Sequence, residues 1–171
     1  AVVTRLLAAA DPADCPPALG AALVLALHRE RAIGNVAMIV YSDLLRPFPH
    51  WFAQLWAESL GKSGHGLNPI PAVGAVDQHS LLQLWLDGPM DKLVTQIRAD
   101  RTGTGLDASG AELDPDLGYL AGRTMGDLMG AEQRATREAL VAAGRPTRVF
   151  RIERVDAESL GALMMHFMIE T

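Results

Sequence analysis

The chain has 171 residues and a net charge of −5, and 49% of its residues are hydrophobic and 20% are charged. This length fits one domain, and the composition excludes a disordered chain. Fifteen basic residues against twenty acidic ones leave no excess of positive charge for nucleic acid or an anionic membrane, so we expect neither partner. The longest fully apolar run, residues 21–27, is also too short to span a bilayer.

The single cysteine indicates a reducing compartment, and the spacing of the histidines argues against a metal site. Cys15 is the one cysteine and cannot form a disulfide within the chain, which favours a reducing compartment, so we expect a cytoplasmic protein. The spacing of His28, His50, His65 and His166 does not match that of paired metal ligands. We therefore expect no metal and no cofactor.

Hydrophobic patterning predicts strands that alternate with helices. The strands are predicted over residues 36–41, 92–98 and 147–153, and the helices over 18–29, 51–60, 77–87, 124–143 and a last segment capped by Asp156. Thr124 with Asp127 resembles a capping box at one helix start. Residues 61–76, rich in Gly and Pro, are predicted to form a long ordered loop, and 99–118 an exposed excursion. The alternation predicts an α/β fold whose parallel sheet is covered on both faces.

Two of the predicted helices carry enough apolar residues to be buried. Residues 18–29 are mostly Ala and Leu and are apolar nearly all round, which predicts a buried helix. Helix 77–87 has a cluster of large apolar side chains near its end, Leu81, Leu82, Leu84, Trp85 and Leu86. We expect only the N-terminus of that helix to face a cleft.

The two ends of the chain suggest a piece of a longer protein. The first residue is Ala1, and an amphipathic stripe continues to the last residues without a Gly or Pro stop signal. The stripe consists of Leu160, Leu163, Met164, Phe167 and Met168. We expect a domain or fragment of a longer polypeptide, the alternative being a natural C-terminus that frays.

Helix 51–60 carries a candidate catalytic pair. Gln54 and Glu58 are four residues apart and therefore share one helix face. A carboxylate at the edge of an apolar face is partly desolvated, which suits a general base. The alternative is a solvated surface glutamate beside an amide.

Helix 77–87 carries a second candidate. If Asp77 caps this helix, His79 lies in its first turn, where the positive end of the helix dipole disfavours the imidazolium. A neutral imidazole can donate or accept a proton, and helix N-termini favour anions such as sugar phosphates. The alternative is a histidine hydrogen-bonded to loop carbonyls.

Several stretches together resemble bacterial glucose-6-phosphate isomerase. They are VYSDLL (40–45), WFAQLWAESLGK (51–62), GAVDQHS (74–80), LWLDGP (84–89), DKL (91–93), AGRT (121–124) and EQR (132–134). The resemblance covers nearly the whole chain, in order, and the QLWAESLGK and DQHS stretches are specific to this family.

The resemblance implies an aldose–ketose isomerase that acts on a sugar phosphate. It implies that residues 1–171 are the second of two sugar-isomerase-type domains, each a three-layer α/β/α sandwich with a mostly parallel sheet. Glu58 then matches the base that moves a proton between C1 and C2 through a cis-enediolate, and Gln54 matches a substrate contact. His79 matches the residue that assists ring opening and reaches the neighbouring subunit of a homodimer.

Other catalytic groups of the family fall outside the matching segment. The phosphate-binding Ser/Thr cluster and an enediolate-stabilising Arg precede it, and a catalytic Lys follows it. The chain also has Asn68 and Leu45 where family members often have Thr and Arg. Two alternatives therefore remain open: a non-catalytic sugar-phosphate-sensing module of the same fold, and a structural pairing domain.

Overall fold

A computed structural model of the chain describes residues 11–108 and 114–171. Its helices are α2 (Pro16–Arg31), α3 (Phe48–Leu60), α4 (Val76–Asp87), α5 (Met125–Ala142) and α6 (Ala157–Glu170). Its strands are β1 (Asn35–Val40), β2 (Asn68–Val73), β3 (Lys92–Ala99) and β4 (Thr147–Ile152). Short 3-10 turns cover Pro12–Asp14, Asp43–Leu45 and Pro115–Leu120.

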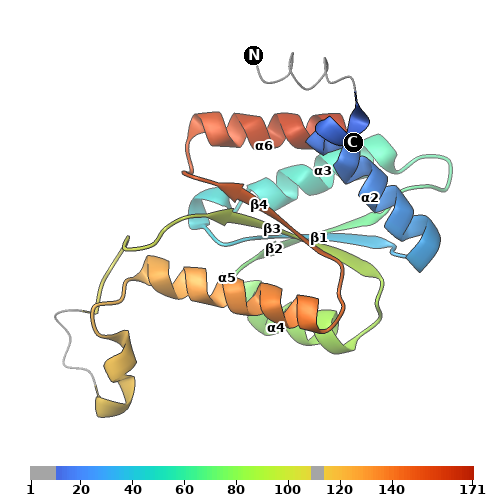
Figure 1. Cartoon of the computed structure of the whole chain (residues 1–171). Helices are drawn as coiled ribbons and strands as arrows, with labels where there is room; N and C mark the ends of the chain where they lie inside the picture. The colour runs from blue at the N-terminus through green and yellow to red at the C-terminus, as the bar shows by residue number, and fades with distance from the viewer. Residues whose placement is uncertain (1–10, 109–113) are drawn as a thin grey trace.

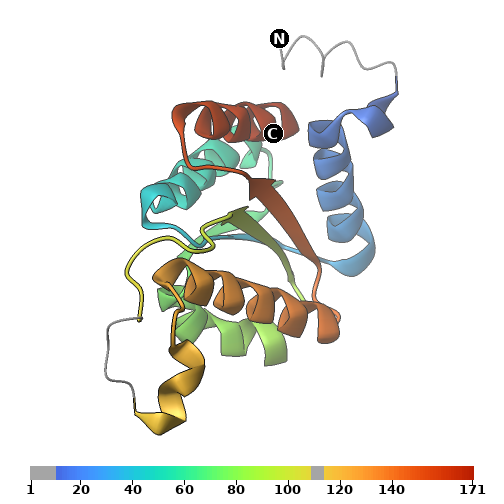
Figure 2. The ribbon, with the colours of Figure 1, turned by 60° about the vertical axis from the view of Figure 1, so that its left-hand side comes forward.

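The strands form one parallel sheet in the order β2-β1-β3-β4. Helices α2, α3 and α6 lie on one face of the sheet, and α4 and α5 lie on the other (Figures 1 and 2). This arrangement confirms the predicted three-layer α/β/α sandwich. Helix α3 connects β1 to β2, and α5 connects β3 to β4 on the opposite face, so the connections after the adjacent strands β1 and β3 cover different faces.

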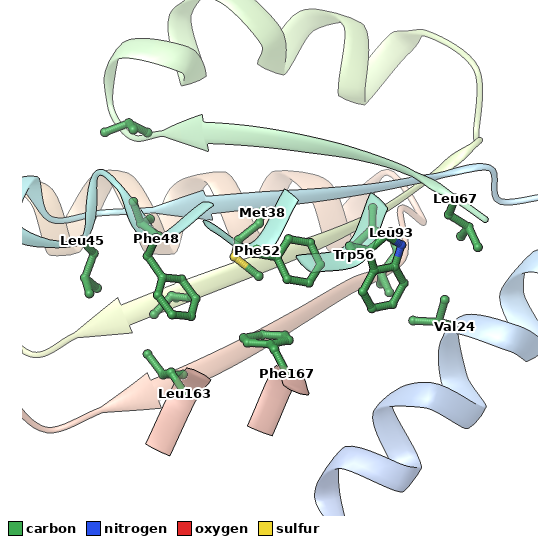
Figure 3. Packing of buried hydrophobic residues seen from close by; sticks show 14 of the residues in the cluster. Val24, Met38, Leu45, Phe48, Phe52, Trp56, Leu67, Leu93, Leu163 and Phe167 are labelled. Atoms are coloured by element: carbon green, nitrogen blue, oxygen red, sulfur yellow. The ribbon is translucent and has the colours of Figure 1, made fainter. Parts of the chain in front are cut away.

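The central strand β1 divides the core between the two faces. Its side chains alternate, as the two-residue period of a strand requires: Val36, Met38 and Val40 pack with one cluster, and Ala37 and Ile39 with the other. Figure 3 shows the first cluster, where aromatic rings of α3 and α6 meet. The Phe52 and Phe167 ring centroids are 5.1 Å apart there, and the Phe52 and Trp56 centroids are 5.2 Å apart.

The prediction of a loop over residues 61–76 was wrong, because β2 lies within it. Asn68 donates from its N–H to the Gly34 carbonyl and Gly74 to the Val40 carbonyl, both at 2.9 Å. Alternate N–H groups of β2 therefore face β1, and Pro69 and Pro71 occupy the positions that face outward. An edge strand tolerates proline there, so a Pro-rich segment that reads as a loop can still form a strand.

Helix α2 is not buried as predicted. Leu19 and Leu25 are each 50% exposed and Leu23 is 42% exposed, whereas Val24 packs into the core. The helix packs mainly against α6. Helix α4 also departs from the prediction, since Trp85 is its one buried residue and Leu84 is 51% exposed.

Two of the predicted helix caps are confirmed. Thr124 and Asp127 form a capping box at the start of α5, and Asp156 accepts from the Ser159 N–H at the start of α6. The excursion after β3 is exposed where the structure describes it, with Leu106 83% exposed; its residues 109–113 lie outside the described residues. Within the described ranges, none of the helices combines the length and apolar character needed to cross a bilayer.

Candidate functional site

Helix α3 presents Gln54 and Glu58 together on its surface. The Gln54 Nε2 donates to the Glu58 Oε1 at 3.2 Å, which is the contact that the four-residue spacing predicts. Phe52 and Trp56 are 1% and 2% exposed and fix the orientation of the helix. Gln54 and Glu58 each follow one of these buried rings by two residues, about 200° around the helix, and so point away from the core.

The predicted desolvation of Glu58 is not found. Both Gln54 and Glu58 are exposed in this chain. The apolar residues next to them on the helix, Trp51 and Leu55, are themselves only partly buried. The geometry supplies an accessible carboxylate whose position is set by an amide. Any apolar surroundings for that carboxylate would have to come from another segment or another chain.

Helix α4 places His79 in its first turn, but Asp77 does not cap the helix as predicted. The N-cap is Ala75, which has no side-chain cap hydrogen bond, and the His79 N–H donates to the Ala75 carbonyl at 3.3 Å. The Asp77 Oδ2 instead accepts from the Val73 N–H at 2.7 Å. Asp77 therefore ties the helix to the end of β2, and the imidazole of His79 is exposed.

Within one chain, Glu58 and His79 are not brought together. Glu58 lies on α3 and His79 on α4, and these helices cover opposite faces of the sheet (Figure 1). They also lie at opposite ends of the strands. Glu58 is close to the end of α3, where the chain returns to the start of β2, whereas His79 is in the first turn of the helix that follows β2.

His79 borders a hollow that the sequence did not reveal. Ala75, Gln78, Leu82, Gln83, Leu86 and Glu132 line it with His79, and its volume is about 500 Å³. Glu132 comes from α5, far along the chain from α4, so no local pattern could have placed its carboxylate beside this histidine. The Tyr41 hydroxyl donates to the Gln78 Oε1 at 2.9 Å and links the hollow to the end of β1.

The Tyr41 hydroxyl is held protonated at neutral pH. Burial raises the pKa of Tyr41 to about 12; the Thr136 side chain acts in the opposite direction and the negative charge of Glu132 in the same one. Tyr41 is 5% exposed, so its hydroxyl is a neutral donor within the protein.

A second cleft, of about 230 Å³, lies at the carboxyl ends of the strands. Its polar lining includes Ser42 and Asp43 after β1 and Arg101 and Thr104 after β3. The helices that follow β1 and β3 cover different faces, and parallel α/β sheets commonly bind ligands at such a switch point. The sequence did not single out this cleft, because its residues come from separate short loops.

Among the residues that the structure describes, no group of three or more His, Cys, Asp or Glu side chains could hold a metal ion. The Cys15 thiol is free. What the described chain offers is acid–base and hydrogen-bonding chemistry from Glu58, Gln54 and His79.

Comparison with known proteins finds relatives named glucose-6-phosphate isomerase. No family model matches the chain. It is 42% identical over 161 residues to a glucose-6-phosphate isomerase of Rubrobacter xylanophilus, covering 93% of this chain and 37% of the relative. It is 46% identical over 155 residues to a probable glucose-6-phosphate isomerase of Halobacterium salinarum, covering 90% and 35%. The chain thus spans little more than a third of the length of these relatives.

Two solved structures share the fold. A hypothetical protein from Thermus thermophilus has a TM-score of 0.79 and 31% identity, covering 91% of this chain and 43% of that one. A glucose-6-phosphate isomerase from Chlamydia trachomatis has a TM-score of 0.74 and 21% identity, covering 90% and 32%, and at this identity it supports the fold alone. Together with the sequence relatives, these matches confirm the resemblance to glucose-6-phosphate isomerase over about nine tenths of the chain.

Proposed function

We propose that this chain is the second sugar-isomerase-type domain of an enzyme that interconverts glucose 6-phosphate and fructose 6-phosphate. The observation that carries the proposal is the hydrogen-bonded pair of Gln54 and Glu58 on the open surface of α3, within a segment that is 42% identical to a named isomerase. An accessible carboxylate held by an amide is what a proton-transfer base needs.

In the proposed reaction, Glu58 removes the C2 proton of the open-chain aldose and returns it to C1. The electron pair left at C2 forms the C1–C2 double bond of a cis-enediolate as the π pair of the C1 carbonyl moves onto the C1 oxygen. A proton passes from the C2 oxygen to the C1 oxygen, and protonation at C1 as the C2 carbonyl forms gives the ketose. The Gln54 amide holds the Glu58 carboxylate in place and contacts the substrate. His79 moves the proton that opens the sugar ring. The reaction is a proton shift within the sugar, so the proposal includes no cofactor.

The separation of Glu58 and His79 supports a homodimer as part of the proposal. One chain cannot direct both side chains at one sugar, since they lie on opposite faces of the sheet. A second copy would supply His79 to the site that contains Glu58. A cytoplasmic location completes the proposal, because the free thiol of Cys15 suits a reducing compartment.

The test is a segment exchange. This chain replaces the matching segment of the Rubrobacter xylanophilus relative, and turnover of fructose 6-phosphate is measured in the purified chimera. Glu58→Gln should lower kcat by several orders of magnitude with little change in substrate binding. Glu30→Gln, at an exposed position of α2, is the matched control. Near-normal turnover in the Glu58→Gln chimera would overturn the proposal.

The cleft at the carboxyl ends of the strands favours a second candidate, a domain that binds a sugar phosphate without catalysis. Arg101 supplies positive charge there, and Ser42 and Thr104 supply hydroxyl groups. NMR spectra of the chain, recorded while fructose 6-phosphate is added, distinguish the two functions. Shifts confined to Ser42, Arg101 and Thr104 support the binding domain, whereas shifts at Gln54 and Glu58 support the isomerase.

A further inference from the structure

The end of β1 and the first turn of α4 are joined by one partly buried side-chain hydrogen bond. The Tyr41 hydroxyl donates to the Gln78 Oε1 at 2.9 Å across 37 residues of chain. Because Tyr41 is 5% exposed, water has little access to this contact, and the other group that interacts with the hydroxyl is the Thr136 side chain of α5. The contact therefore fixes Gln78 as well as Tyr41.

Two further contacts hold the same turn. Gly74 precedes α4 and packs directly on the Tyr41 ring, where even a Cβ atom would collide with the ring carbons. The Asp77 Oδ2 accepts from the Val73 N–H at 2.7 Å. The first turn of α4 is thus fastened to the ends of β1 and β2 by a ring contact and two hydrogen bonds.

The fastened turn carries the two side chains that border the hollow from α4. Gln78 and His79 both line it, opposite Glu132 of α5. Since the Gln78 oxygen is held by Tyr41, its amide nitrogen is the end left for another group. The Glu132 Oε2 is buried and finds no hydrogen-bond partner among the described residues. The hollow thus combines an amide donor, an imidazole and a carboxylate.

We propose that Tyr41 is a positioning residue for His79, acting through Gln78. Its hydroxyl sets the orientation of the Gln78 amide and of the first turn of α4, and so sets where the imidazole of His79 points. The effect on turnover rests on the proposed function, in which His79 opens the sugar ring. The effect on the conformation of His79 does not.

The conformational part is tested in this chain by NMR of the histidine ring protons. The chain has five histidines and two tyrosines. Tyr41→Phe removes the hydroxyl and keeps the ring, and Tyr119→Phe, at a 72% exposed position, is the matched control. Tyr41→Phe should shift the His79 signals and speed hydrogen exchange of the α4 first-turn amides, while the other four histidines and the control stay unchanged.

Gln78→Leu is the second variant, and combining it with Tyr41→Phe measures the coupling between the two residues. It removes the acceptor from the other side, so it should shift the His79 signals as Tyr41→Phe does. The double variant should shift them no further, because both changes break one contact. If Tyr41→Phe fails to fold, Gln78→Leu decides alone. Unchanged His79 signals in the folded variants, or additive shifts in the double variant, would overturn the inference.

The catalytic part is tested in the segment-exchange chimera with two substrates. Fructose 6-phosphate must open its ring, whereas 5-deoxyfructose 6-phosphate lacks the hydroxyl that closes the ring and is always open. Tyr41→Phe should lower kcat on the first substrate by roughly threefold to tenfold, as the loss of one ordinary hydrogen bond would, and leave kcat on the second nearly unchanged. An equal loss on both substrates indicates a merely structural role and overturns the positioning of His79.

A His79→Ala chimera separates the two proposals. If that variant turns over fructose 6-phosphate as fast as the unsubstituted chimera, the proposed role of His79 is wrong. The NMR result in the chain then still decides whether Tyr41 positions His79.

Discussion

Arg148 of β4 forms a 2.8 Å ion pair with Glu170 of α6, whose side chain is fully buried. The Arg148 Nε also donates to the Thr95 Oγ1 at 2.9 Å, and the His166 Nε2 lies 3.1 Å from the Glu170 Oε2. The guanidinium stacks 5.3 Å from the Phe150 ring centroid. These contacts join the edge of the sheet to the last helix through groups that are shielded from water.

Glu170→Gln should therefore destabilise the chain strongly. The change leaves the Arg148 guanidinium, 11% exposed, without its counter-charge, and breaking a buried pair in this way costs about 3–5 kcal/mol. Urea unfolding followed by circular dichroism measures the free energy of unfolding. Glu138→Gln is the control, because the Glu138 side chain is 67% exposed in its pair with Arg137 and the pair is expected to contribute at most about 1 kcal/mol. Similar losses in the two variants would contradict the prediction.

Gly20→Ala should destabilise the chain although alanine favours helices. A Cβ at Gly20 would lie 2.5 Å from the Glu170 Oε2 and 3.1 Å from the Arg148 Nη1. Displacing this buried pair is expected to cost about 1–3 kcal/mol, as overpacking does. Gly161→Ala is the matched control, since a Cβ there meets nothing within 4 Å and should stabilise α6 by up to about 1 kcal/mol. In thermal unfolding, Gly20→Ala should lower the midpoint temperature and Gly161→Ala should raise it.

Stability should fall between pH 10 and pH 12 because of Tyr41. Burial raises its pKa from 10.0 in the unfolded chain to about 12 in the folded one. Above pH 10 the unfolded chain releases this proton and the folded chain does not, so rising pH favours unfolding. Urea unfolding across this range should show the loss, and Tyr41→Phe should reduce it. If the free energy of unfolding of Tyr41→Phe falls with pH as steeply as that of the original chain, another group causes the loss.

The exposed leucines of α2 should drive reversible self-association of the chain. Leu19 and Leu23 are 50% and 42% exposed and share one helix face because they are four residues apart, and an apolar patch of this kind favours contact with another surface. Leu23→Glu should lower the weight-average mass in sedimentation experiments. Leu106→Glu, at an 83% exposed position on the excursion after β3, serves for comparison. A larger effect at Leu106 than at Leu23 would place the contact away from α2.

The fold was predictable where local patterns decide it. The apolar run at residues 36–41 became β1, and the capping box of Thr124 and Asp127 starts α5 as predicted. The strand β2 was missed because Pro69 and Pro71 normally exclude a central strand, and only the sheet order shows that β2 is at an edge. Likewise, the apolar composition of α2 does not reveal whether anything covers its leucines.

The candidate site was predictable only within one helix at a time. The spacing of Gln54 and Glu58 is a local property and gave the observed hydrogen bond. Their exposure, and the opposite placement of His79, depend on which face of the sheet each helix covers. The link from Tyr41 to Gln78, and the approach of Glu132, join three separate elements, and no spacing within one element predicts them.

The two prolines of β2 also protect the chain from aggregation through that edge. Pro69 and Pro71 have no N–H to offer, and the N–H of Val73, the remaining outward-facing one, is occupied by Asp77. The outer side of β2 thus lacks the free donors that an incoming strand would need to extend the sheet into a fibril. A strand that approached this side would receive no N–H donors from β2 and could form only half of the hydrogen bonds of a regular ladder.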